Sequence, residues 1–344
     1  MPLSLFAVKT GILLQAAVMV LATWLASPAC ADWQRREAAI MGTVITVEVF
    51  HQDPLIAGQA VGTVLGEMHR IDKLMSPFIE TSELARLNAH AARAPMEVSE
   101  ELFALVQRSL YFSRLTEGAF DVTFASAGYL YDYRKGKHPD REQLKELTPL
   151  IDYHKLILDK EQSTIAYGHP GIRIDLGGIA KGYAVDRCLQ LVKQLGIEHA
   201  LVTAGGDSAV AGDRLGRPWT IGVRDPRDEE KLAAVVPLVD VAVSTSGDYQ
   251  RYFEKGGVRY HHIIDPASGD SARELRSVTI IGADATTTDA LSTSVFVLGP
   301  QAGLALIDRL PDIDAILIDR NGRMHYSSGL ARMAGHPDAS SRDL

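Results

Sequence analysis

The sequence of 344 residues is poor in cysteine, with only Cys30 and Cys188, and it has no extended basic block. Two cysteines allow at most one disulfide bond, and none if Cys30 leaves with a cleaved leader, so packing must stabilise the fold. Cys188 lies at helical spacing with Ala184 and Val192, which indicates a buried core thiol rather than a nucleophile. The formal net charge of −8, with Lys and Arg spread along the chain, argues against nucleic acid as a partner.

Several familiar sequence patterns are also missing. We find no internal repeat, no low-complexity tract, no Walker loop, no GxGxxG fingerprint and no two-histidine zinc motif on a helix. What is present is a composition of 46% hydrophobic and 23% charged residues, which predicts a folded protein with a full-sized core.

The first 31 residues differ from the rest. Lys9 precedes an apolar run from Gly11 to Leu25, and small residues follow up to Ala31. The run is shorter than the ~20 residues that span a bilayer, so we interpret residues 1–31 as a signal peptide cleaved after Ala31. Cys30 offers an alternative, a lipidated N-terminus anchored in the inner membrane, but Ser27 and Pro28 fit a lipoprotein signal poorly. A soluble periplasmic product is the favoured reading.

Strand and helix patterns are mixed without strict alternation, which predicts an α+β fold. Helices are expected over residues 61–75, 99–116, 181–195 and 286–298, with a short charged helix before Leu147. Strands are expected over residues 43–50, 156–159, 172–176, 200–203 and 315–319. We expect the folded domain to cover residues 32–335, and residues 336–344 to form a loose tail.

The most unusual segment runs from Asp175 to Asp186, where a strand is expected to end at an acid and two glycines precede a helix with Lys181 in its first turn. A helix start gathers unpaired amides and a positive dipole end, which suit a phosphate group. The same glycines also fit a simple strand-to-helix turn. A second pair, Gly205-Gly206 before Asp207, is read as structural, with ligand contact as the minority alternative.

Two further segments carry polar groups. Asp289 and Thr293 are one turn apart on a predicted helix, so their oxygens face the same side and suit magnesium. Capping of the helix by Thr286 or Thr287 is the simpler explanation from spacing alone. His261 and His262 are adjacent on a predicted strand, so they point to opposite sides and are poorly placed to bind one metal.

Taken in order, these segments together with Met41-Gly42-Thr43 and Gly118-Ala119-Phe120-Asp121 resemble the ApbE family of FAD:protein FMN transferases. The resemblance covers nearly the whole chain after the predicted signal peptide. It implies a single unit of two lobes with the flavin nucleotide in the cleft between them. It also reverses the preference for capping, because in the family Asp289 and Thr293 correspond to magnesium ligands and Gly178 to a backbone contact.

The resemblance implies the remaining site residues as well. These are FAD contacts at Met41, Phe78, Ala119, Phe120, Asp121, Asp175, Lys181, His262 and Ile263. It implies transfer of FMN from FAD to a Ser or Thr hydroxyl of an acceptor flavoprotein, by a phosphoester linkage and with release of AMP. The expected acceptor is a subunit of a respiratory electron-transfer complex.

The expected catalytic residues are Lys181, Asp289 and His262. We hypothesise that His262 moves the hydroxyl proton, because histidine titrates near neutrality, although a metal-bound Asp is an alternative base. Two rival functions stay open at the level of sequence. One is a magnesium-dependent FAD pyrophosphatase that yields FMN and AMP, and the other is a flavin-binding carrier that leaves its ligand intact.

Overall fold

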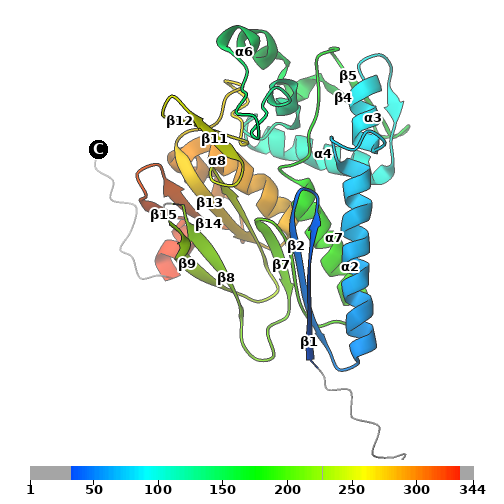
Figure 1. The fold of residues 1–344 in the computed structure, drawn as a ribbon, viewed down its shortest axis with the longest axis vertical. Coiled ribbons are helices and arrows are strands. Elements are labelled where there is room, and N and C mark those ends of the chain that lie inside the picture. Colours follow the sequence, from blue (N-terminus) through cyan, green and yellow to red (C-terminus); the bar gives the residue numbers. More distant parts are fainter. Residues whose placement is uncertain (1–31, 227, 334–344) are drawn as a thin grey trace, which may run out of the picture.

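The computed structural model describes residues 32–226 and 228–333. The expected signal peptide and the expected C-terminal tail both lie outside these residues. Helix and strand are mixed, which confirms the α+β prediction. In Figure 1 a large sheet with three long helices forms the lower part, and shorter helices with a small sheet form the upper part.

The main sheet has eight strands in the order β1-β2-β6-β7-β10-β13-β14-β15, and every neighbouring pair is antiparallel. Its strands are β1 (Asp32–Ile40), β2 (Thr43–His51), β6 (His199–Ala204), β7 (Asp207–Ala211), β10 (Ala242–Gly247), β13 (Leu275–Gly282), β14 (Asp314–Asp319) and β15 (Met324–Tyr326). The expected strands near residues 43–50, 200–203 and 315–319 are therefore confirmed.

Both faces of the sheet's centre are covered, because adjacent residues of a strand point to opposite faces. Ala242 belongs to the large core beneath the long helices, whereas Val243 belongs to a smaller core around Trp219. The smaller core lies under the ribbon of β8 (Trp219–Asp225) and β9 (Asp228–Leu238). The sheet thus forms the middle layer of three.

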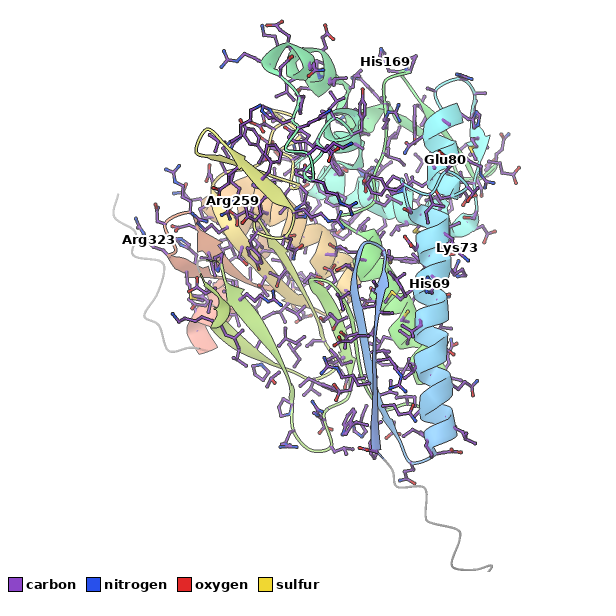
Figure 2. All side chains as sticks on the ribbon, in the orientation of Figure 1. His69, Lys73, Glu80, His169, Arg259 and Arg323 are labelled. Atoms are coloured by element: carbon purple, nitrogen blue, oxygen red, sulfur yellow. The ribbon has the colours of Figure 1, made fainter. Side chains whose placement is uncertain are left out.

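Three long helices form one outer layer: α2 (Pro54–Met75), α7 (Ala180–Gln194) and α8 (Ala285–Ile307). In α2 the buried side chains recur every three to four residues, from Val61 and Val64 to Met68 and Met75, as the sequence predicts. His69 and Lys73 project from its other side, away from the sheet (Figure 2). Asp53 caps the start of α2 by accepting a hydrogen bond from the Leu55 amide.

α8 is interrupted. Gly299 has non-helical angles (φ 76°, ψ 179°), so the first helical segment ends where the sequence predicts, before Gly299 and Pro300. Within the described residues α8 is the one helix long and apolar enough to span a membrane, yet over half of its apolar stretch is buried inside the protein. It is a core helix that packs against β10 and β13.

The upper part contains four further helices and a small sheet. Its helices are α3 (Glu83–His90), α4 (Glu100–Leu115), α5 (Ala125–Gly128) and α6 (Arg141–Leu147), with short 3-10 turns η1 (Val122–Phe124), η2 (Thr148–Leu150) and η3 (Tyr153–Lys155). A three-stranded sheet has the order β3-β5-β4, with β3 (Met96–Glu97), β4 (Leu156–Asp159) and β5 (Thr164–Tyr167). A hairpin of β11 (Tyr252–Lys255) and β12 (Val258–His261) packs against the loop before α6, and α9 (Ser328–Met333) follows β15.

One continuous core joins the two parts. It includes Val47 of the main sheet, Leu291 of α8, Leu102 of α4 and Ile165 of the small sheet. The two lobes therefore form a single folding unit.

The expected strand over residues 172–176 is absent, and this prediction was wrong. The segment is irregular, and side chains take the place of a neighbouring strand. Asn88 accepts a hydrogen bond from the Ile174 amide and donates one to its carbonyl, while Ser126 Oγ accepts from the Arg173 amide. The apolar alternation reflects burial of Ile172 and Ile174, not sheet pairing.

Candidate functional site

Three charged side chains from three different elements meet at the centre of the molecule. Lys181 lies in the first turn of α7, Asp207 begins β7, and Asp289 lies in the second turn of α8. Lys181 Nζ is 2.6 Å from Asp207 Oδ2 and 3.4 Å from both carboxylate oxygens of Asp289. Both aspartates are 2% exposed, so their carboxylates are shielded from solvent, whereas the Lys181 side chain is 27% exposed.

The charges in this centre do not balance. Burial alone would lower the pKa of Lys181, but the two carboxylates beside it raise that pKa above its usual value, so the ammonium stays charged. Burial, reinforced by the charge of Asp207, raises the pKa of Asp289 to about 7. Two buried carboxylates share one ammonium, and the centre therefore favours an additional cation.

Thr293 and Gly178 lie beside this centre. A Cβ built on Gly178 would be 3.2 Å from Thr293 Oγ1 and 3.2 Å from Phe120 Cε2. The turn before α7 thus faces the same side of α8 that carries Asp289, one helical turn away. The structure brings together the three groups that the family resemblance implies as metal ligands, with the ring of Phe120 against them.

A glycine permits the close approach of α7 and α8 that this arrangement needs. A Cβ on Gly182 would lie 2.1 Å from the Ala285 carbonyl oxygen and 2.8 Å from Asp289 Cβ. The Gly182 amide donates to Asp289 Oδ2 over 3.0 Å. This amide at the helix start therefore orients a carboxylate, whereas the sequence suggested a phosphate as the partner of such amides.

The alternative prediction that Thr286 or Thr287 caps α8 is wrong. The helix begins at Ala285, and Asp284 is its N-cap, accepting from the Thr287 amide. Asp186 of α7 accepts from the Ala285 and Thr286 amides over 2.7 and 2.8 Å. The cap fixes α8 onto α7 and leaves Asp289 and Thr293 free for another role.

His262 follows the last residue of β12, so only His261 of the pair lies in a strand. The Nδ1 atom of His262 is buried and has no hydrogen-bond partner among the described residues. Burial, with Arg251 and Lys181 nearby, lowers its pKa to about 3. The ring is thus neutral at pH 7, and the expected titration near neutrality does not hold for this environment. Ile263 beside it is 4% exposed.

Met41 and Asp175 belong to two turns beside Arg251. Met41 has a positive φ of 55° in the turn between β1 and β2, and the next residue accepts a hydrogen bond from Arg251 Nη2 through its carbonyl, over 3.0 Å. Burial raises the pKa of Asp175, and the charges of Arg251 and Lys181 oppose that rise. Asp175 Oδ1 accepts from the Gly177 amide over 2.7 Å, which shapes the turn before α7.

Three further expected FAD contacts, Phe78, Asp121 and Ala119, lie in loops outside the charged cluster. Phe78 is 83% exposed, and none of the described contacts links it to the centre. Asp121 uses both oxygens internally: Oδ1 accepts from the Thr123 amide and Oδ2 from the Tyr153 amide. Its arrangement is that of a residue that holds a loop, and it positions the adjacent Phe120. Ala119, half-buried in the same loop, stays a prediction.

Sequence reasoning missed two members of the site, Asp207 and Arg251. Asp207 was read as part of a structural turn, yet its carboxylate is nearer to Lys181 than that of Asp289. The sequence signal that could have indicated Asp207 was an acid placed directly after a predicted strand and two glycines. Arg251 lies in a loop without periodicity, so the sequence held no comparable signal for it.

The donor set fits a hard divalent cation that shares ligands with its substrate. Within residues 32–226 and 228–333, no three His, Cys, Asp or Glu side chains form a metal-binding group. The oxygens that the resemblance implies as ligands are those of Asp289, the Thr293 hydroxyl and the Gly178 carbonyl, and the Asp207 carboxylate lies on the same lysine. Magnesium is commonly bound in this way, through one or two carboxylates, waters and substrate phosphates.

Comparison with known proteins confirms the resemblance. The family model described as "ApbE family" matches residues 41–317. A FAD:protein FMN transferase of Treponema pallidum is 34% identical over 314 residues, covering 86% of this chain and 87% of the relative. One of Klebsiella pneumoniae is 33% identical over 297 residues, covering 85% of this chain and 90% of the relative.

Solved structures agree with the fold. The ApbE protein of Thermotoga maritima superposes with a TM-score of 0.81 at 35% identity, covering 88% of this chain and 99% of that structure. The flavin transferase ApbE of Vibrio cholerae gives a TM-score of 0.79 at 28% identity, with coverages of 88% and 99%. From the family match, the similarity over most of the chain and the shared fold, the protein belongs to the ApbE family.

Proposed function

We propose that this protein is a FAD:protein FMN transferase, which moves FMN from FAD to a Ser or Thr hydroxyl of an acceptor flavoprotein and releases AMP. Its curated relatives carry that activity in their names. The observation that carries the proposal is the cluster in which two buried carboxylates, Asp207 and Asp289, share the single ammonium of Lys181, beside Thr293 and Gly178. A protein that only carried an intact flavin would have no use for such a centre.

Asp289, Thr293 and the Gly178 carbonyl would hold magnesium in this proposal. When bound, the ion would neutralise charge on the pyrophosphate oxygens of FAD. Lys181 adds a positive charge at the same place, and Asp207 keeps its ammonium aimed at the centre over 2.6 Å.

In the proposed reaction, the acceptor oxygen forms a bond to the FMN-side phosphorus as the bond to the bridging oxygen breaks. AMP leaves with that bridging oxygen, and the acceptor hydroxyl loses its proton. His262 is the proposed acceptor of this proton, because its buried Nδ1 has no hydrogen-bond partner among the described residues.

The main rival is hydrolysis, in which water replaces the acceptor hydroxyl and the products are free FMN and AMP. The purified protein should be incubated with FAD and Mg²⁺, with and without an acceptor flavoprotein domain. We expect a flavin-labelled acceptor and one AMP for each label. Free FMN in the presence of acceptor would favour the hydrolase, and intact FAD would favour a carrier.

We further propose that the enzyme acts in the periplasm on a respiratory electron-transfer subunit. The proposal is supported by the pattern of residues 1–31. The alternative of a lipid anchor at Cys30 gives the same compartment with membrane attachment.

A further inference from the structure

A group of exposed cations lies on one side of the candidate site. Arg134 and Lys137 belong to the loop before α6, and Lys255 ends β11. We refer to Arg134, Lys137 and Lys255 as the basic surface. All three side chains are exposed, and none forms an ion pair with any described residue.

Neighbouring cations behave differently. Lys135 pairs with Asp132 over 3.3 Å, and Arg259, which extends from the β11–β12 hairpin in Figure 2, pairs with Glu254 over 3.1 Å. Arg273 pairs with Asp270 over 2.8 Å. These three neighbouring cations are compensated by carboxylates, whereas the three cations of the basic surface form no ion pair with a described residue, on a chain whose formal net charge is −8.

Stacked rings hold the loop and the hairpin together beneath these charges. His138 stacks on Tyr260 with 4.3 Å between ring centroids, and Phe253 stacks on Tyr260 at 5.2 Å. Lys255 Nζ lies 3.4 Å from His138 Nε2, so the cation of the hairpin is fixed against the loop. The loop and the hairpin that carry the basic surface are therefore held together by ring stacking.

The same elements lead directly to the site. Tyr133, next to Arg134, donates through its hydroxyl to the His261 carbonyl over 3.4 Å. His262 follows in the chain, and its amide donates to the Arg251 carbonyl. A protein segment lying on the basic surface would therefore enter the site from the side of His262.

We infer that the basic surface docks an acidic segment of the acceptor protein, next to the hydroxyl residue that receives FMN. The inference rests on the proposed function and specifies its partner. FAD brings only two phosphate charges, and the proposed function assigns these to the metal centre beside Lys181, whereas the basic surface is exposed and spread over two elements. Charge complementarity of this kind gives specificity and a fast, salt-sensitive encounter.

The test uses fluorescent peptides that contain one threonine flanked either by Asp and Glu or by Asn and Gln. Peptide binding is measured by anisotropy at 20 and 300 mM NaCl. The variant R134E/K137E/K255E reverses the basic surface. The matched control R86E/R93E/K160E reverses three exposed cations, equally free of ion pairs among the described residues, on and near α3 and the small sheet. FAD affinity is measured by flavin fluorescence.

We expect the acidic peptide to bind the wild type at least about tenfold more tightly than the neutral peptide at low salt, with the difference shrinking at high salt. The basic-surface variant should lose this preference and keep its FAD affinity, and the control should resemble the wild type. Equal binding of the two peptides to the wild type would overturn the inference, as would an equal loss of FAD affinity in the variant. Normal peptide preference without flavin transfer would instead refute the proposed function.

Discussion

At the scale of single residues, the site depends on two buried carboxylates that share one ammonium group. Asp289 and Asp207 are both buried, and one lysine serves both. Removing a partner from such a group leaves another charge uncompensated, so the effects of substitutions are expected to be large and specific.

Asp289→Asn keeps the shape of the side chain and removes its charge. We expect Mg²⁺-dependent turnover of FAD to fall about 100-fold or more, because a ligand and a charge are lost at the reacting phosphates. Calorimetric titration with Mg²⁺ in the presence of AMP should show weakened binding. A folded variant with wild-type turnover would remove Asp289 from the metal site.

His262→Ala tests the proposed proton acceptor. Loss of a positioned base is expected to slow transfer about 100-fold or more, with the affinity for FAD changed much less. Single-turnover labelling of an acceptor at saturating FAD and Mg²⁺ measures this directly. A full transfer rate would assign the proton to another group, such as a carboxylate near the metal.

His261 predicts a pH effect on stability that is separate from catalysis. Its Nε2 lies 2.6 Å from the Ala272 carbonyl and its Nδ1 accepts from the Ile263 amide, which together require the neutral ring. Burial lowers its pKa to about 4. Between pH 6.5 and 4 the unfolded chain binds a proton that the folded chain excludes, so stability decreases as the pH falls through this range.

The expected loss from His261 is about 3 kcal/mol by pH 4. Urea unfolding of the wild type and of His261→Gln at several pH values measures it. The variant should be less stable at pH 7 but show a shallower decline. Parallel curves for the two proteins would mean that His261 does not carry the effect.

At the scale of elements, the contact between α7 and α8 aligns the site. Gly182→Ala introduces a Cβ that must displace the Ala285 carbonyl, so the helices must separate and Lys181 must move from Asp289. We expect a loss of about 1–3 kcal/mol in unfolding free energy together with weaker transfer activity.

The control for Gly182→Ala is Gly62→Ala, in the middle of α2, where an added Cβ meets no atom within 4 Å. There the substitution should stabilise the fold by about 0.5–1 kcal/mol, because alanine loses less backbone entropy in a helix. Thermal melts and labelling rates of both variants provide the comparison. If Gly182→Ala behaved like Gly62→Ala, the close approach of α7 and α8 would not control the site.

At the scale of the whole molecule, the sequence predicted what local periodicity and recognisable motifs encode. The α7 and α8 segments, the break at Gly299 and the placement of Asp289 and Thr293 one turn apart on a helix follow from spacing. The contacts between residues far apart in the chain could not be predicted from the sequence. Asp207 meets Lys181 only because β7 begins beside α7, and Asp186 accepts a hydrogen bond from the Ala285 amide across 99 residues of chain.

The strand wrongly expected over residues 172–176 has the same origin. Alternating burial of Ile172 and Ile174 mimics a strand, and only the tertiary structure shows that Asn88 and Ser126 satisfy the backbone instead. Arg251 was not predicted as a site residue because a loop residue shows no sequence periodicity. Its position depends on a contact with the distant turn at Gly42.

Export is the prediction that concerns the complete molecule. β1 starts at Asp32 and pairs with β2 along its whole length, from Asp32 opposite His51 to Ile40 opposite Thr43. Cleavage after Ala31 would therefore leave every described residue of β1 in the mature chain. We expect the periplasmic product to begin at Asp32 by intact mass, and a chain starting at Asp32 to match its melting temperature.

Lipidation is distinguished from simple cleavage with Cys30→Ser. If Cys30 carries a lipid, the wild type will fractionate with membranes, begin at a modified Cys30, and become soluble on substitution. If the signal peptide is cleaved after Ala31, as we expect, both proteins will be soluble with the same N-terminus, because Cys30 is removed in either case. Retention of an unprocessed Met1 in the cytoplasm would contradict both, and the flavin acceptor would then have to be sought inside the cell.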